Sequence, residues 1–143
     1  MDLPEKLKFN AIFTQGGAFR ANLGESSKKR YYFVLNKNPQ QDDLLILSTS
    51  TTAYNLHRNC KGGDDVHIPL SPNDYSEFAE DCLICCERPV RTPKNKLKKI
   101  LTSQNYEILP PLPQPVLKKI LDGIRKSSTV SPREKQLILG CEE

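Results

Sequence analysis

The sequence lacks any long hydrophobic run. Its purely apolar stretches reach only about four or five residues, whereas a membrane-spanning helix needs roughly 18. The first residues, Met1 to Lys8, alternate in charge and contain no apolar segment, so they do not have the form of a secretory signal. These absences predict no membrane partner and, by default, a cytoplasmic location.

Common catalytic motifs are missing as well. The chain has no G-x-S-x-G sequence, no glycine-rich phosphate-binding loop and no H-E-x-x-H metal motif. Its two histidines, His57 and His67, have no obvious serine or cysteine partner nearby in the sequence. A packed or surface role is favoured for His67, which we expect on a strand, and His57 falls in a polar loop. We predict no cofactor.

Cysteine is present in a pattern that is poor for disulfides. An odd number of cysteines with irregular spacing does not form an obvious disulfide framework, and the five lie at Cys60, Cys82, Cys85, Cys86 and Cys141. Cys82 and Cys85 match a C-x-x-C motif, but a zinc site needs a second pair of ligands. We favour small buried apolar residues on a strand. A metal or redox centre built on Cys82, Cys85, Cys86 and Cys60 stays open as an alternative.

The remaining composition is that of a single soluble domain. The chain has 143 residues, of which 27% are charged and 37% hydrophobic, which is enough to bury a substantial core. The net charge is +4 and the sequence pI is about 8.8. This mild basic bias permits nucleic-acid binding without requiring it.

A pair of apolar runs forms the centre of the predicted fold. Residues 31–35 and 44–47 flank a polar turn at 36–43, which is typical of an antiparallel strand pair. Neither run alternates cleanly, so we expect strands buried on both faces or a small closed barrel. Further strands are expected at 66–70, 82–86 and 106–109, with Pro69 near an edge and 82–86 central. Apolar residues near the N-terminus, Phe9, Ala11 and Phe13, also have strand spacing.

Helices are predicted later in the chain. A basic helix is expected around 94–101, an amphipathic helix at 116–126 that begins after Pro115, and a last helix from a capping box at Ser131 to Gly140. The order of strands first and helices later predicts a mainly β, α+β fold: a small antiparallel barrel or half-barrel with C-terminal helices.

Arg30 and Thr51 are the best candidates for chemistry. Cleavage of RNA without a metal needs proton transfer and a cation that stabilises the pentavalent phosphorane. An arginine can hold the phosphate through paired hydrogen bonds, and a hydroxyl can position the phosphate or pass a proton. From spacing alone, a surface arginine and a strand-end threonine remain the favoured interpretation.

The order of five segments resembles the MazF/PemK family of toxin endoribonucleases. The matching segments are Gly17-Ala18-Phe19, residues 30–36 beginning at Arg30, residues 45–52 ending in Thr51-Thr52, Val66-His67-Ile68, and residues 80–87 followed by Arg91-Thr92. The similarity covers about residues 17–101. Two positions depart from the family pattern: Tyr31 replaces the proline after the arginine, and Ala18 replaces an acidic residue.

The resemblance implies an SH3-like barrel and a toxin-type endoribonuclease. The whole chain, 1–143, would be one domain with its core at about 17–101, an N-terminal extension and C-terminal helices. It would cut single-stranded RNA, as in mRNA, by attack of the 2′-OH and leave a 2′,3′-cyclic phosphate. Family members are homodimers controlled by a cognate antitoxin protein.

The resemblance also assigns roles to particular residues. Arg30 would stabilise the phosphate and act in acid/base chemistry, with Thr51 as its hydroxyl partner. The RNA-binding face would include residues of the loop 20–29 and two positions after the strand expected at 82–86, namely Arg20, Lys28, Lys29, Glu87 and Arg91. The basic run Lys94 to Lys99 either contacts the RNA backbone or is a solvated helix face. The alternative function is a non-catalytic SH3-like module that binds nucleic acid or protein.

Overall fold

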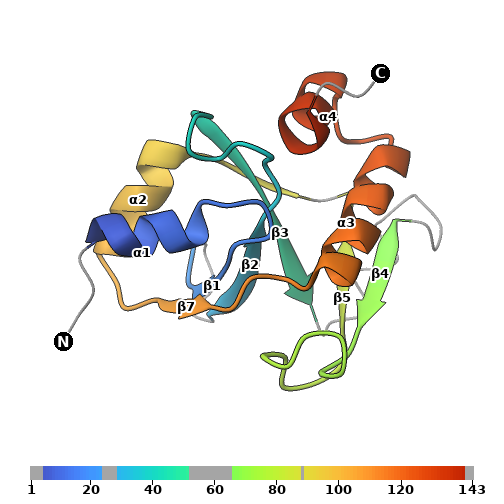
Figure 1. Ribbon diagram of the computed structural model, residues 1–143, viewed down its shortest axis with the longest axis horizontal. Helices are drawn as coiled ribbons and strands as arrows, with labels where there is room; N and C mark the ends of the chain where they lie inside the picture. The colour runs from blue at the N-terminus through green and yellow to red at the C-terminus, as the bar shows by residue number, and fades with distance from the viewer. Residues whose placement is uncertain (1–4, 24–28, 52–65, 88, 141–143) are drawn as a thin grey trace.

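One antiparallel sheet lies between two pairs of helices (Figure 1). The computed structural model describes residues 5–23, 29–51, 66–87 and 89–140. The helices are α1 (Glu5–Ile12), α2 (Lys94–Thr102), α3 (Gln114–Lys126) and α4 (Pro132–Leu139). The strands are β1 (Ala18–Ala21), β2 (Arg30–Val34), β3 (Leu44–Thr51), β4 (His67–Leu70), β5 (Cys82–Cys85), β6 (Val90–Pro93) and β7 (Glu107–Leu109). The predicted mainly β, α+β class is confirmed.

Strand β3 pairs with three other strands of the sheet. The strands follow the order β4-β5-β3-β2-β1-β7, and β6 also pairs with β3. One edge of β3 pairs with β2, while its other edge pairs first with β6 at 44–47 and then with β5 at 50–51. The pairing does not return from β7 to β4, so the sheet of the described residues is open, and the expected closed barrel is not found. The predicted central strand, β5, lies second from the edge.

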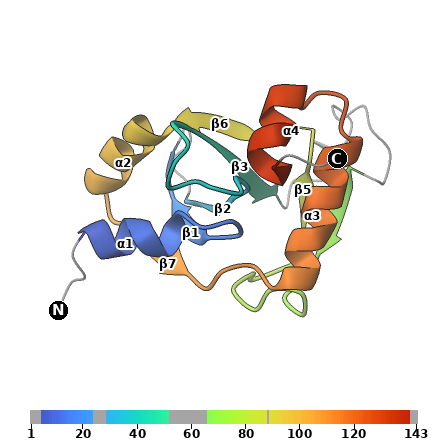
Figure 2. The ribbon, with the colours of Figure 1, turned by 45° about the horizontal axis from the view of Figure 1, so that its top comes forward.

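Helices lie on both sides of the sheet (Figure 2), and each face of the sheet contributes to its own hydrophobic core. Successive residues of β2 point alternately to the two faces, and Phe33 belongs to one core while Tyr32 and Val34 belong to the other. The first, which we call the α3–α4 core, includes Ile120 and Ile138 from those helices. The second, the α1–α2 core, includes Ile12 from α1 and Leu97 from α2. The expectation of strands buried on both faces is therefore confirmed.

The turn between β2 and β3 is fixed by one buried side chain. The amide of Asn36 accepts a hydrogen bond from the backbone N–H of Ile46 at 2.7 Å and donates to the carbonyl of Leu44 at 2.9 Å. It also donates to the Asp42 carboxylate at 2.9 Å. These bonds take the place of water for a polar group that is completely buried. The antiparallel pairing predicted from the two apolar runs is confirmed.

The C-terminal elements follow their sequence signals closely. In α4, the Ser131 hydroxyl accepts a hydrogen bond from the Glu134 N–H, and the Glu134 carboxylate accepts one from the Ser131 N–H, so the predicted capping box is confirmed. Gly140 ends this helix with a φ of 78°, a conformation that other residues rarely adopt. Helices α2 and α3 also lie where they were predicted, and Pro69 is in the edge strand β4.

The N-terminal segment differs from the prediction. Residues Phe9 and Phe13 have the spacing of a strand in the sequence, but Phe9 lies in helix α1 and Phe13 directly follows it. Their rings stack with centroids 5.7 Å apart, as the i, i+4 neighbours of a helix can do. Packing of Ile12 and Phe13 into the α1–α2 core selects the helix over the extended alternative.

Candidate functional site

Arg30 and Thr51 belong to neighbouring strands and lie at the same end of them. Arg30 is the exposed first residue of β2 and Thr51 is the last residue of β3. The β2–β3 register pairs Tyr32 with Thr49, and two further steps along it would bring Arg30 opposite Thr51. Arg30 and Thr51 therefore lie at the same end of two neighbouring strands. The Thr51 side chain itself lies outside the described part of the chain.

The Arg30 side chain shares a face of the sheet with the α1–α2 core. It is two positions from Tyr32, which packs in that core, and it pairs across the strands with Ala21 of the same core. Burial raises the pKa of the Tyr32 hydroxyl, and the positive charge of Arg30 opposes part of that rise. Lys29 is exposed directly before Arg30, whereas the predicted RNA-binding residue Lys28 lies outside the described residues. Two cationic residues, Lys29 and Arg30, therefore stand at this end of β2.

Arg20 lies on the opposite face of the sheet from Arg30. It pairs with Tyr31 on β2 and Glu107 on β7, and Tyr31 packs against the α3–α4 core. Its guanidinium carbon is 5.5 Å from the centroid of the Tyr31 ring, and its Nη1 is 3.9 Å from the Glu107 carboxylate. The two arginines, which the family resemblance predicts at one RNA-binding face, therefore lie on opposite faces of the sheet.

Arg91 and Glu87 are also distant from Arg30. Arg91 pairs with Ile46, five residues before Thr51, which corresponds to about 17 Å along the strand. The backbone carbonyl of Glu87 accepts a hydrogen bond from the Thr129 hydroxyl at 2.7 Å, and the residue is buried. Both positions therefore contact the α3–α4 region, and neither lies at the end of the sheet where Arg30 is exposed.

Glu134 is an important partner that the sequence did not reveal. Its carboxylate accepts hydrogen bonds from Nε and Nη2 of Arg91, the second at 3.0 Å, while also closing the capping box. The guanidinium is the main cause that lowers the pKa of Glu134 to about 2, and the Ser131 N–H adds to the effect. The capping motif is visible in the sequence, but the contact with Arg91 joins residues 43 positions apart.

The cysteines fall into two groups. Cys82 and Cys86 are buried free thiols, and burial raises their pKa values to about 11 and about 12. They match the predicted role of small core residues. Cys85 is disulfide-bonded, which departs from the expectation that this cysteine pattern disfavours disulfides; Cys60 and Cys141 lie outside the described residues. Within the described ranges, the structure contains no cluster of three or more side chains that could hold a metal ion.

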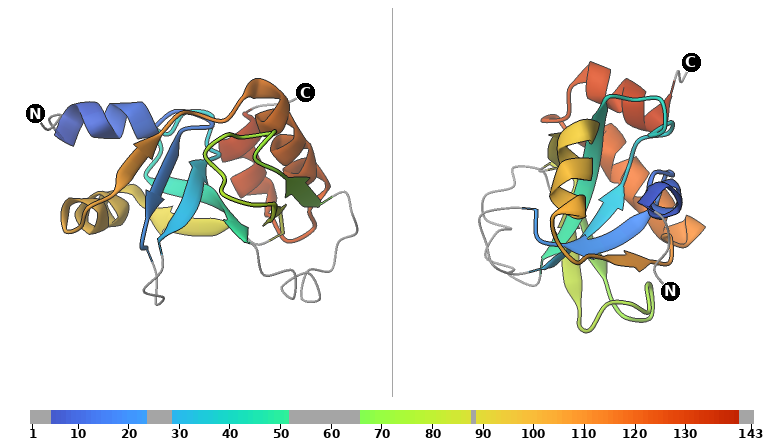
Figure 3. Two further views of the ribbon diagram at one scale, coloured as in Figure 1. Left: turned by 90° about the horizontal axis from the view of Figure 1, so that it is seen from below. Right: turned by 90° about the vertical axis from the view of Figure 1, so that its left-hand side faces the viewer.

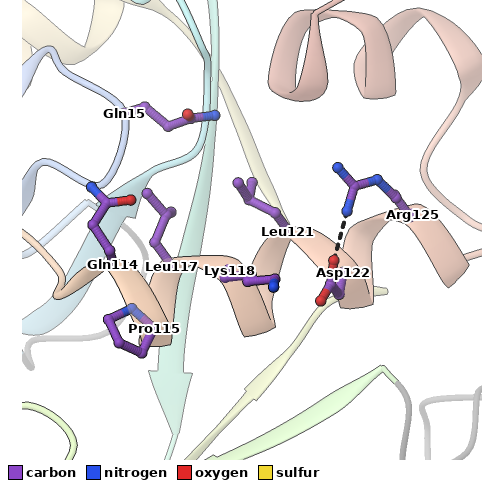
Figure 4. Close-up of a pocket in the computed structure, with 8 residues that line it drawn as sticks. All are labelled: Gln15, Gln114, Pro115, Leu117, Lys118, Leu121, Asp122 and Arg125. Atoms are coloured by element: carbon purple, nitrogen blue, oxygen red, sulfur yellow. Dashed lines mark hydrogen bonds and ion pairs between the residues drawn. The ribbon is translucent and has the colours of Figure 1, made fainter. Parts of the chain in front are cut away.

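A separate pocket of about 560 Å³ runs along α3 (Figure 4). The apolar residues Leu117 and Leu121 line it, together with an ion pair in which Arg125 Nη1 lies 2.6 Å from Asp122 Oδ1. Gln15 closes one side and donates hydrogen bonds to the carbonyls of Leu35 and Ile138. Since Leu35 follows the far end of β2, this pocket is remote from Arg30 and belongs to a different surface.

Comparison with known proteins adds no assignment: no family model and no curated protein matches the sequence. None of the helices in the described ranges combines the length and the apolar character needed to span a bilayer. The function is therefore inferred from the residues themselves.

Proposed function

We propose that this protein is a toxin-type, metal-independent endoribonuclease that cuts single-stranded RNA. The observation that carries the proposal is the position of Arg30 and Thr51 at the same end of two adjacent strands. Arg30 is exposed there, with Lys29 beside it, so a phosphate can approach the guanidinium from solvent. This end of the sheet offers a cation and a strand-end hydroxyl residue within reach of one phosphodiester.

The proposed reaction is an attack of the 2′-OH on the adjacent phosphorus. The 2′-oxygen forms a bond to phosphorus, the bond from phosphorus to the 5′-oxygen breaks, and the proton lost at the 2′-OH is balanced by one gained at the 5′-oxygen. Negative charge develops on the equatorial phosphate oxygens, and the Arg30 guanidinium stabilises it through two parallel hydrogen bonds. Thr51 orients the phosphate. The products are a 2′,3′-cyclic phosphate and a 5′-OH.

The proposal also includes an SH3-like type of fold and a set of binding partners. We infer that β1, β2, β3, β5 and β6 form an open version of an SH3-like barrel, in which β3 contributes both of its edges. The proposed substrate is single-stranded mRNA, and the proposed inhibitor is a cognate antitoxin protein. The protein would act as a homodimer in the cytoplasm. Arg91 and Glu87, by contrast, have structural contacts and are not needed for this site.

Incubation of the purified protein with mixed-sequence single-stranded RNA in EDTA tests the proposal. Wild type is compared with Arg30→Ala and Thr51→Ala, and Lys119→Ala on the exposed side of α3 is the control. We expect fragments with cyclic phosphate ends from wild type and the control. Loss of the charge-stabilising group should slow cleavage by Arg30→Ala at least about 100-fold.

Other results would count against the proposal in different ways. Cleavage that survives both substitutions would show that the site lies elsewhere. RNA affinity without product from any variant would favour the alternative function, a non-catalytic module that binds nucleic acid. The pocket along α3 is the observation that favours this alternative, because it offers a binding surface that does not include Arg30 or Thr51.

A further inference from the structure

Helices α1 and α2 carry lysines on the same side of the sheet as Arg30. Helix α2 has the sequence KNKLKKILT, with four lysines and no acidic residue, and only Leu97 and Leu101 of this helix are buried. Lys96 and Lys99 are exposed, and Lys98 is half-buried. We call Lys8, Lys96, Lys98 and Lys99 the α1–α2 basic surface.

Two of these ammonium groups are held over aromatic rings. Lys98 Nζ lies 5.7 Å from the centroid of the Phe9 ring and 5.8 Å from that of Phe13. Lys8 Nζ lies 5.7 Å from the centroid of the Tyr106 ring. A ring below a lysine restrains the side chain without neutralising its charge. The surface therefore presents restrained positive charges beside two half-exposed rings, those of Phe9 and Tyr106.

The α1–α2 basic surface begins next to the proposed site. Arg20 pairs with Glu107, so one further step along the β1–β7 register places Tyr106 opposite Ala21, which in turn pairs with Arg30. Tyr106 is thus two strands, or about 10 Å, from Arg30. The Gln104 side chain fixes this arrangement, since it accepts a hydrogen bond from the Asn22 N–H at 3.0 Å and donates to the Asn22 carbonyl at 2.7 Å.

The acidic residues of three ion pairs, Glu107, Asp122 and Glu134, lie away from α2. Glu107 contacts Arg20 on the α3–α4 side of the sheet. Asp122 and Glu134 belong to α3 and α4, which lie on the opposite side of the sheet from α1 and α2 (Figure 3). Among the described residues, Lys96, Lys98 and Lys99 form no ion pair. Arg30 and the lysines of α2 therefore lie on the same side of the sheet, and Tyr106 lies on that side as well.

We propose that the α1–α2 basic surface binds the phosphate backbone of single-stranded RNA beside the Arg30 site. This inference rests on the proposed function, because it extends the path of the same substrate. Spaced cations alternating with partly exposed rings suit single-stranded nucleic acid, since phosphates bind the cations and bases stack on the rings. Recognition of this kind is largely independent of sequence, so it would increase affinity without setting the cleavage site.

The test measures binding of a fluorescent single-stranded RNA by Arg30→Ala protein, so that the RNA stays intact. A triple substitution on the surface, Lys96→Gln, Lys98→Gln and Lys99→Gln, is compared with Lys118→Gln, Lys119→Gln and Lys126→Gln on α3. Both sets remove three positive charges, but the second set lies on the opposite side of the sheet. The double substitution Lys96→Gln and Lys99→Gln repeats the test with exposed residues only, in case the loss of Lys98 disturbs the packing of Phe9.

A plot of log affinity against log salt has a negative slope, and each phosphate contact contributes roughly 0.7 to its magnitude. We expect the surface triple variant to reduce that magnitude by about 2 and the double variant by about 1.4. The α3 variant should bind as the parent does. Equal losses in both triple variants would show a general charge effect and overturn the inference. Normal binding by the surface variants, with wild type still cutting RNA, would overturn the inference alone. Neither binding nor cleavage of RNA by wild type would overturn the proposed function with it.

Discussion

Glu134 shows how one residue can connect two distant parts of the chain. Its carboxylate closes the first turn of α4 and accepts both hydrogen bonds from Arg91 of β6. The carboxylate is mostly buried, so its charge is compensated by these partners more than by water. Arg91 is thereby held against α4, away from the Arg30 end of the sheet.

Substitution of Glu134 should weaken the fold in two separable steps. Glutamine keeps the capping box but removes the charge, so Glu134→Gln should cost about 1 kcal/mol in free energy of unfolding at pH 7. Glu134→Ala removes both contacts and should cost about 2 kcal/mol. Urea denaturation measures both values, with Ser131→Ala as a control that removes only the cap. Equal stability of wild type and Glu134→Gln would contradict the role of the charge.

The same pair predicts a pH dependence. The folded-state pKa of Glu134 is lowered to about 2 from an ordinary value of 4.5, so its contribution is fully present above pH 4.5. It is lost as the pH falls from 4.5 towards 2 and the carboxylate becomes protonated in the folded state. The stability difference between wild type and Glu134→Gln should therefore shrink across this interval. A constant difference from pH 7 down to pH 2 would contradict the assignment.

At the scale of single residues, the sequence predicted features that depend on neighbouring residues. It did not predict contacts between residues that are far apart in the chain. The capping box at Ser131 and the stop at Gly140 depend on residues within one helical turn, and both were predicted. The position of Arg91 depends on α4 returning to β6, which no local pattern encodes. For the same reason, the sequence could not show that Arg20 and Arg30 point to opposite faces, because that depends on strand pairing.

At the scale of elements, α3 is the main cover of one face of the sheet. Its residue Ile120 is completely buried in the α3–α4 core, and its carbonyl accepts a hydrogen bond from the Cys86 thiol. Pro115 at the start and the apolar spacing of the helix made α3 predictable. The short helix α1 was not predictable in this way, since Phe9, Ala11 and Phe13 also fit an extended strand.

Truncation of Ile120 should destabilise the protein strongly. Ile120→Ala removes buried methyl groups and leaves a cavity, which should cost about 2–5 kcal/mol. Lys119→Ala, on the exposed side of the same helix, should stay within about 0.5 kcal/mol of wild type. Thermal and urea unfolding followed by circular dichroism measure the difference. Similar values for both variants would mean that α3 does not cover the sheet as described.

At the scale of the whole molecule, two cores share one sheet. Strands β2 and β3 contribute side chains to both the α1–α2 core and the α3–α4 core. Loss of either core would therefore expose residues of the same strands. This shared layer should make the protein unfold as one cooperative unit.

Mild truncations on the two sides of the sheet test this cooperativity. Leu97→Val in the α1–α2 core and Ile120→Val in the α3–α4 core should each cost about 1 kcal/mol. The double variant should show one transition and a sum that is additive within about 0.5 kcal/mol, since the sheet separates the two sites. Calorimetry that resolved two transitions, each moved by only one substitution, would contradict the shared sheet.

The ends of the sheet have a consequence for self-association. Both edges of β3 are occupied, so the open edges among the described strands belong to β4, to β7 and to β6, which pairs with β3 alone and ends at Pro93. Strand β4 has only four residues and contains the exposed Pro69, which has no N–H to donate; β7 has three residues and is followed by Pro110 and Pro111. Short edges with prolines resist the addition of a further strand from another chain. Two copies of this protein would therefore meet through their side chains rather than by joining their sheets into one.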